Sequence, residues 1–200
     1  DMIGTKGGPK VIALEGEFAM TEGHAQELKT QALALQVGKR LRVILSDNNA
    51  GIDDALLGGV ISNKFGGYDL PAQWTSYGWN VIRNVDGHDA EAISAAIAKA
   101  KKSDKPTLIC CKTAIGQGSP NMAGSDKVHG SPLGAAEIAA TRVALNWPYA
   151  PFEIPKDIYA AWDFKKRGQS LEHDWNKQFQ AYKNKYPDLA KELQRRMQGD

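Results

Sequence analysis

The sequence is short of cysteine, has no long hydrophobic run and carries little excess charge of either sign. Its two cysteines, Cys110 and Cys111, are adjacent, which excludes a disulfide scaffold; we expect two buried thiols in a reducing, cytoplasmic compartment. No apolar run reaches the length of a membrane span, and the polar, Gly-rich N-terminus lacks the apolar stretch of a signal peptide. The formal net charge of +2 gives no reason to expect nucleic acid or a membrane as a partner.

The 200 residues suffice for one α/β domain with a buried core. Short apolar runs alternate with helical patterns. Strands are expected at 11–14, 41–45, 78–85 and 106–111, and helices from Thr21 to Gly38, at 91–102 and at 135–145. Thr21 is the expected cap of the first helix, and Gly38 its expected end. Two or three further helices are expected in 156–197.

This alternation predicts a three-layer α/β sandwich with a mainly parallel sheet and a C-terminal helical extension. We place the sheet domain at residues 1–145 and the extension, a linker toward a further domain, at 146–200. The first residue is not methionine, which is compatible with a piece of a longer chain. Ligands of such sheets bind at the carboxyl ends of the strands.

Oxygen-bearing side chains follow the first two predicted strands. The first loop offers Glu17, and the second offers Asp47, Asn48 and the main-chain carbonyls beyond them. Such oxygen ligands suit Mg²⁺ or Ca²⁺. A helix beginning near Thr21 adds N–H groups that favour a phosphate, so the pattern indicates a diphosphate cradle. The alternative is that these carboxylates are solvated or cap helices. His88, before a helix, is interpreted as a capping and packing residue.

Longer motifs resemble transketolases, a family of thiamine-diphosphate-dependent enzymes, over nearly the whole chain. The matching segments are GEFAMTEG (16–23), SDNNAGID (46–53), YGW (77–79), DGHD (86–89), KTAIGQGSPN (112–121), HGSPLG (129–134) and YAPFEIP (149–155). The resemblance implies a thiamine-diphosphate-binding fold and a transferase of the pentose phosphate pathway. Its activity would be the transfer of a two-carbon ketol unit between sugar phosphates.

The resemblance also implies residue roles. Glu17, Asn48 and the main-chain carbonyl of Ala50 would bind the metal, Mg²⁺ or Ca²⁺. Glu17, Asn48, His129 and the backbone at Phe18 would bind thiamine diphosphate, and His129 would also take part in catalysis. Glu22 matches a glutamate at the dimer interface of the family, near the partner's cofactor-activating glutamate.

Three positions depart from the family pattern. Glu17 stands where the family has an aspartate, Phe18 where it has a glycine, and Asp126 where a histidine is common. Phe18 carries a bulky side chain where glycine would let the backbone approach a phosphate closely. These departures leave open a degenerate transketolase-like structural or regulatory subunit with altered or lost cofactor binding. A different thiamine-dependent transfer or decarboxylation is a third possibility.

Parts of the family's active site have no counterpart in the sequence. In the family, further active-site histidines precede this stretch, and the activating glutamate lies in the following domain. We therefore expect the chain alone to be inactive. Its expected partners are a pyrimidine-binding transketolase domain or subunit and sugar phosphates, in a homodimer or higher assembly.

Overall fold

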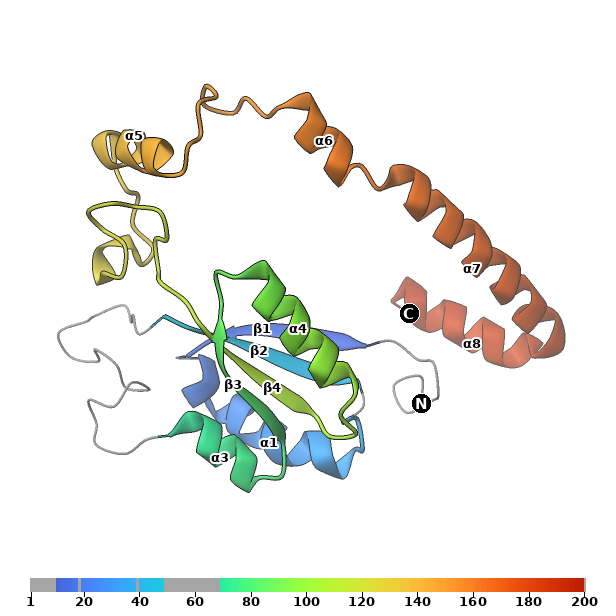
Figure 1. Cartoon of the computed structure of the whole chain (residues 1–200). Coiled ribbons are helices and arrows are strands. Elements are labelled where there is room, and N and C mark those ends of the chain that lie inside the picture. The colour runs from blue at the N-terminus through green and yellow to red at the C-terminus, as the bar shows by residue number, and fades with distance from the viewer. Residues whose placement is uncertain (1–9, 18, 39, 49–68, 200) are drawn as a thin grey trace. The chain divides into compact units, whose positions relative to one another are not determined.

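The computed structural model of the chain describes residues 10–17, 19–38, 40–48 and 69–199 (Figure 1). The strands are β1 (Val11–Gly16), β2 (Leu41–Asp47), β3 (Asn80–Asp86) and β4 (Thr107–Lys112). The helices are α1 (Gly23–Ala34), α3 (Leu70–Ser76), α4 (Ala90–Lys101), α5 (Ala135–Ala144), α6 (Lys156–Trp162), α7 (Lys165–Lys185) and α8 (Pro187–Gln198), with 3-10 helices η1 (Ala19–Thr21) and η2 (Asp126–Val128). The chain divides into two compact units between Trp147 and Pro148.

The four strands form one sheet in the order β1-β2-β4-β3, and every neighbouring pair is parallel. Parallel strands need crossover connections, and each connection between successive strands contains a helix here: α1 between β1 and β2, α3 between β2 and β3, and α4 between β3 and β4. The predicted α/β class with a parallel sheet is therefore confirmed.

Helices lie on both faces of the sheet, with α4 on one side and α1 and α3 on the other (Figure 1). Successive strand residues point to opposite faces, which divides the core in two. The first core, toward α1 and α3, contains Met20, Ala32, Val43, Leu45, Leu70, Trp74, Trp79, Leu108 and Cys110. The second, toward α4, contains Ile82, Val85, Ala96, Ala100, Ile109 and Cys111. The adjacent cysteines thus lie in different cores, buried as predicted.

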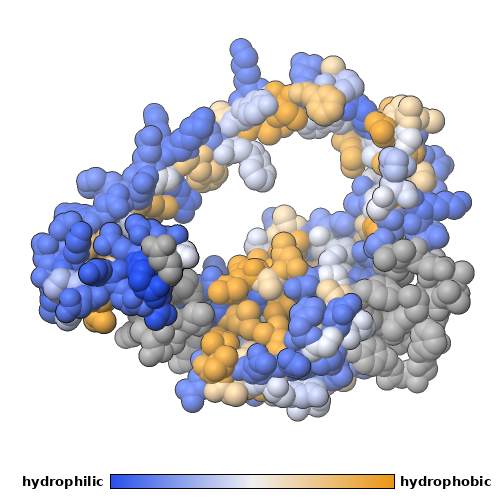
Figure 2. Space-filling model, turned by 180° about the vertical axis from the view of Figure 1, so that it is seen from behind, coloured by the Kyte–Doolittle hydropathy of each residue, from blue (hydrophilic) through white to orange (hydrophobic). Residues whose placement is uncertain are grey.

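No described element covers β1 on the face of the sheet against which α4 packs. Helix α4 packs on β3 and β4, whereas Ile12 and Leu14 of β1 are 50% and 75% exposed. Figure 2, the view from behind, shows a hydrophobic patch exposed in its lower centre. Parallel sheets are usually covered on both faces, so this edge has the character of a contact surface.

Two sequence predictions at the ends of α1 were wrong. Thr21 ends η1 instead of capping α1, whose N-cap is Glu22 and receives no side-chain cap. Helix α1 ends at Ala34, and Gln36 takes the left-handed conformation, with φ of 53°, in a turn closed by the Val37 N–H on the Ala32 carbonyl. Gly38 meets a different need, because a Cβ there would lie 2.7 Å from the Asp104 carbonyl oxygen.

Lys29 is a fully buried lysine on α1. Its ammonium donates to the side-chain oxygens of Gln26 and Gln73, the latter at 2.8 Å, and lies 5.3 Å from the ring centroid of Trp74. Its carbonyl accepts the Trp79 indole N–H at 2.9 Å. Burial lowers the pKa of Lys29 from its usual value, because the charged form loses water. The core therefore contains a cation whose charge costs stability.

This burial predicts a pH dependence. In the unfolded chain Lys29 has the ordinary lysine pKa of about 10.4, whereas in the folded chain its pKa is lower. Between these two pKa values the unfolded state binds more protons than the folded state, so the free energy of unfolding should rise with pH there. The difference in unfolding free energy between wild type and Lys29→Met should shift in favour of wild type from about pH 7 to about pH 10. Urea denaturation at several pH values measures it. Lys165→Met, at a position 87% exposed, is the control; the same flat difference for both variants would contradict the prediction.

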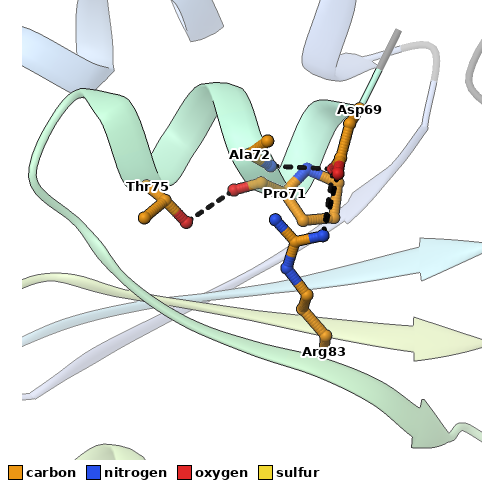
Figure 3. A network of polar contacts seen from close by, with 5 residues as sticks. All are labelled: Asp69, Pro71, Ala72, Thr75 and Arg83. Atoms are coloured by element: carbon orange, nitrogen blue, oxygen red, sulfur yellow. Dashed lines mark hydrogen bonds and ion pairs between the residues drawn. The ribbon is translucent and has the colours of Figure 1, made fainter. Parts of the chain in front are cut away.

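Helix α3 is fixed to β3 by a polar network (Figure 3). Asp69 caps the helix by accepting the Ala72 N–H at 2.8 Å, and the same carboxylate pairs with Arg83 of β3 at 2.9 Å. The hydrogen bond from Arg83, then that from Ala72, lowers the pKa of Asp69. One carboxylate thus both starts the helix and holds it against the strand that follows.

The second unit contains α6, α7 and α8, which confirms the predicted C-terminal helices. Helices α7 and α8 contact each other. Rings stack along α7, with centroids 5.5 Å apart for Trp175 and Phe179. On α8, hydrogen bonds from Arg195 and Arg196 lower the pKa of Glu192 to about 2. No described helix has the length and apolar character required to cross a membrane.

Candidate functional site at the carboxyl edge of the sheet

The carboxyl ends of β1 and β2 lie side by side, as the sequence pattern predicts. The strands pair in parallel with Gly16 opposite Ser46, so Glu17 and Asp47 come next at the same edge. Glu17 and Asp47 are buried, at 4% and 7% exposure, and Asn48 is half-buried. Two carboxylates and one amide from segments about thirty residues apart therefore share one edge.

Asp47 is tied to β4 and keeps one oxygen uncommitted. Its Oδ2 pairs with the Lys112 ammonium, and its main-chain carbonyl accepts the Thr113 N–H at 3.0 Å. Its Oδ1 is buried and has no hydrogen-bond partner among the described residues. Buried carboxylate oxygens are nearly always satisfied in folded proteins, so this atom marks a position where a donor or a cation would be stabilised.

The loop after β4 is attached to the same edge. The hydroxyls of Ser46 and Thr113 are 2.8 Å apart, and the Gly87 N–H donates to the Lys112 carbonyl at 2.8 Å. A Cβ at Gly87 would lie 2.4 Å from the Thr113 methyl carbon. Glycine is therefore required where β3 ends, because the start of the loop passes directly against it.

His88 binds this loop instead of capping α4. Its Nε2 accepts the Ala114 N–H at 2.8 Å. The α4 cap is Asp89, whose Oδ1 accepts the Glu91 N–H at 2.8 Å. The interpretation of His88 as a capping residue was wrong. Its sequence neighbours Asp86 and Asp89 each use their carboxylate to close the local turn, which leaves the imidazole available to the loop.

A pocket of about 430 Å³ opens at this edge, on the α4 side of the sheet. Strand ends, α4 and the start of the loop line it: Leu14, Glu15, Gly16, Ile44, Ser46, Gly87, Ile93, Cys111 and Thr113. The lining combines aliphatic side chains with two hydroxyls and exposed strand ends. It is the kind of concave, largely apolar surface in which ligands or partner segments are bound.

His129 lies in the loop between β4 and α5, at the end of η2, with an exposed side chain. Its N–H donates to the Asp126 carbonyl at 2.9 Å. The Gly124 N–H donates to the Ile115 carbonyl at 2.8 Å, which folds the loop back on its own start. A Cβ at Gly116, whose φ is +67°, would lie 3.0 Å from the Val128 side chain. The residue before His129 therefore packs against the beginning of the loop.

The structure places some of the predicted site residues, and others lie outside the described residues. Glu17 and Asn48 lie at one sheet edge, and His129 lies in the loop that leaves this edge. Phe18 and Ala50 lie outside the described residues. Within residues 10–17, 19–38, 40–48 and 69–199, no three His, Cys, Asp or Glu side chains gather closely enough to hold a metal ion. The assigned roles of these residues stay predictions.

Sequence reasoning missed the polar contacts that join this edge together. The pair between Asp47 and Lys112 spans 65 positions, and the bond between His88 and Ala114 spans 26. A signal was present, because Lys112 directly follows a buried strand, as Asp47 ends another. That signal alone does not give the order of the strands in the sheet, which decides that Asp47 and Lys112 meet.

Known proteins resemble this chain over almost its full length. The family profile described as "Transketolase, thiamine diphosphate binding domain" matches residues 9–200. Transketolase 1 of Escherichia coli strain K12 is 47% identical over 189 residues, covering 94% of this chain and 28% of that relative. Transketolase 1 of Vibrio cholerae is 49% identical over 186 residues, covering 92% of this chain and 27% of its own length.

Solved structures give the same result. The transketolase of Pichia stipitis, in complex with sedoheptulose-7-phosphate, superimposes with a TM-score of 0.79 at 34% identity, covering 96% of this chain and 28% of that one. The transketolase of Leishmania mexicana gives a TM-score of 0.80 at 26% identity, with the same coverage. The chain thus spans little more than a quarter of these relatives.

Proposed function

Because the chain belongs to the transketolase family, where it matches the thiamine diphosphate binding domain, we propose that its whole protein transfers a two-carbon ketol unit between sugar phosphates. Membership confirms the resemblance drawn from the motifs. Sugar phosphates as substrates are supported by solved relatives, whose structures hold sedoheptulose-7-phosphate and fructose-6-phosphate. The observation that carries the proposal is the buried Glu17 beside Asp47 and Asn48 at the carboxyl edge of a parallel sheet.

The oxygen donors at this edge fit a divalent cation. Glu17 offers a carboxylate and Asn48 an amide oxygen, and Ala50 would add a main-chain carbonyl; such a set suits Mg²⁺ or Ca²⁺. The uncommitted, buried Oδ1 of Asp47 supports this fit, since a cation or its bound water would satisfy it. Because no three titratable ligands gather among the described residues, the amide and carbonyl oxygens are needed to complete the set.

The cofactor's diphosphate would lie at the same edge. The N-terminus of α1 follows Glu17 after η1, and its N-cap Glu22 makes no side-chain cap there. The first N–H groups of a helix favour an anion. When bound, thiamine diphosphate supplies the electron sink that stabilises the transferred carbon unit. His129 would bind the diphosphate and orient a substrate hydroxyl, from a loop held to the sheet edge at Thr113 and Ala114.

Other segments complete the site in this proposal. We infer a pyrimidine-binding domain or subunit that supplies the activating glutamate, in a homodimer or higher assembly in the cytoplasm, with Glu22 at the interface. Glu22 has an exposed side chain, as an interface residue requires before assembly. The relatives are more than three times as long as this chain, which leaves room for such a domain in one polypeptide.

Calorimetric titration tests the cofactor site. Thiamine diphosphate with Mg²⁺ is titrated into the complete native assembly, for wild type, Glu17→Ala and Glu17→Asp. We expect micromolar or tighter binding by wild type and Glu17→Asp, which keeps a carboxylate, and no measurable binding by Glu17→Ala, which removes a metal ligand. A folded wild-type assembly that binds no cofactor would overturn the proposal and favour the structural or regulatory subunit that Phe18 and Asp126 suggest.

A further inference from the structure

Glu137, in the first turn of α5, is a carboxylate only 9% exposed. Buried carboxylates need partners for both oxygens, and here the loop between β4 and α5 provides them. We infer that Glu137 is a positioning residue, which holds this loop on α5 and thereby sets the place of His129. The anchoring of the loop rests on the geometry alone, whereas its effect on the reaction rate rests on the proposed function.

Three donors from the loop converge on the Glu137 carboxylate. The Ser119 hydroxyl and the Asn121 main-chain N–H donate to Oε1, the latter at 2.9 Å. The Asn121 side-chain amide donates to Oε2 at 2.9 Å. The Ser119 oxygen in turn accepts the Met122 N–H at 3.2 Å. One side chain of α5 therefore fixes the four-residue stretch 119–122.

The site requires a carboxylate. Every partner of Glu137 is a donor, and bonds from Ser119, then Asn121, lower the pKa of Glu137, so the charged form is the bound one. A glutamine of the same size would point an NH₂ group at one of these donors. Glu137→Gln therefore keeps the size but replaces charge-assisted bonds with weaker neutral ones, and it keeps all three bonds only if the Asn121 amide turns its oxygen toward the new NH₂ group.

Contacts within the loop connect this anchor to His129. Gly118, with φ of +92°, passes so close to α5 that an added Cβ would lie 2.6 Å from the Leu145 side chain. Gly124 is hydrogen bonded to Ile115, and Val128 packs against Gly116. Because the loop is folded on itself in this way, moving residues 119–122 moves the segment that ends at His129.

Limited proteolysis tests the anchor. Lys127 is exposed in η2, so its cleavage by trypsin, followed by mass spectrometry in the complete protein, reports release of the loop. Glu137→Gln should accelerate this cleavage about tenfold or more. Glu91→Gln, an exposed glutamate in the first turn of α4, is the matched control and should leave it unchanged. Ser119→Ala, which removes one donor and keeps the carboxylate, should give a smaller acceleration. Equal cleavage rates in wild type, Glu137→Gln and Ser119→Ala would overturn the inference.

A double-mutant cycle tests whether Glu137 acts through His129. In ketol-transfer assays Glu137→Gln should lower kcat, whereas Glu137→Gln added to His129→Ala should cause no further loss. Losses that multiply would show that Glu137 supports only the general structure, and would overturn its positioning role. If wild type shows no ketol transfer, the proposed function fails, and the proteolysis comparison alone decides whether Glu137 holds the loop.

Discussion

Replacing Trp74 with alanine is expected to lower the free energy of unfolding by about 3–5 kcal/mol. Trp74 is completely buried between α3 and the sheet, where its ring meets that of Trp79 edge to face at 4.5 Å and an interplanar angle of 83°. The Lys29 ammonium also lies over it. Alanine would leave a large cavity that these neighbours cannot close. Since domains are stable by only about 5–15 kcal/mol, this loss would leave the sheet unit close to unfolding.

Urea denaturation followed by circular dichroism measures the effect. Trp162→Ala, at a position 81% exposed on α6, is the matched control and should change stability by no more than about 0.5 kcal/mol. Trp74→Phe covers the case in which the alanine variant does not fold. It keeps most of the ring volume and removes a buried indole N–H that has no hydrogen-bond partner in the part of the chain that the structure describes, so its loss of stability should be smaller. Equal losses for Trp74→Ala and Trp162→Ala would contradict the packing described for α3.

Replacing Leu14 with glutamate should strongly reduce both the binding of a hydrophobic dye to the chain and its self-association. Leu14 is 75% exposed on the open face of the sheet, beside Ile12. Apolar surface of this kind, on an edge strand, promotes aggregation and dye binding, and a charge at its centre opposes both. Because the side chain is already mostly in water, the substitution should cost little stability.

Dye fluorescence and sedimentation velocity measure this prediction. Val143→Glu provides the control, since Val143 is 78% exposed but belongs to α5 and not to the sheet. It introduces the same charge at similar exposure and should leave the dye signal and the association state largely unchanged. If both variants reduce the signals equally, the added charge and not the sheet face is responsible.

The sequence was sufficient to predict the architecture of the first unit. Short apolar runs such as 41–45 and 106–111 have the length of strands, and the Ala-rich segment between Asp89 and Lys102 has the period of a helix. Their alternation implies parallel pairing, because a helix between two strands returns the chain to the same end of the sheet. Strand ends differed by one or two residues, since side-chain patterns do not determine where hydrogen bonding stops.

Local signals failed where tertiary contacts decide. Gly38 has the residue type of a helix end, but the structure uses it for close contact with Asp104 and Pro106, more than sixty residues later. Gln36 adopts the left-handed conformation without being glycine. Glutamine pays some strain there, which the closing hydrogen bonds of the turn offset. No property of residues 21–38 by themselves predicts this.

The candidate site was predictable to the same extent as the sheet. The sequence predicts that Glu17 and Asn48 lie at the same edge of the sheet, because parallel strands have their carboxyl ends at the same edge. The contacts within the site could not be predicted from the sequence. Ser119 bonds to Glu137 across a loop and Asp47 pairs with Lys112 across two strands, and the spacing of these residues along the chain does not reveal that they meet. The identity of the cofactor was predicted from the motif resemblance, because the oxygen ligands alone indicate only a divalent cation and a diphosphate.

The strand order has a consequence for synthesis on the ribosome. In the described sheet β3 pairs only with β4, which inserts between β2 and β3 although it comes last in the sequence. While the chain emerges, β1 and β2 can pair, but β3 has no hydrogen-bonding partner until residues 107–112 have left the exit tunnel. When β4 then inserts, its residues complete both hydrophobic cores at once. The nascent chain therefore passes through a stage in which β3 is unpaired and its core residues Ile82 and Val85 are not yet buried, and binding by a chaperone would be most useful then.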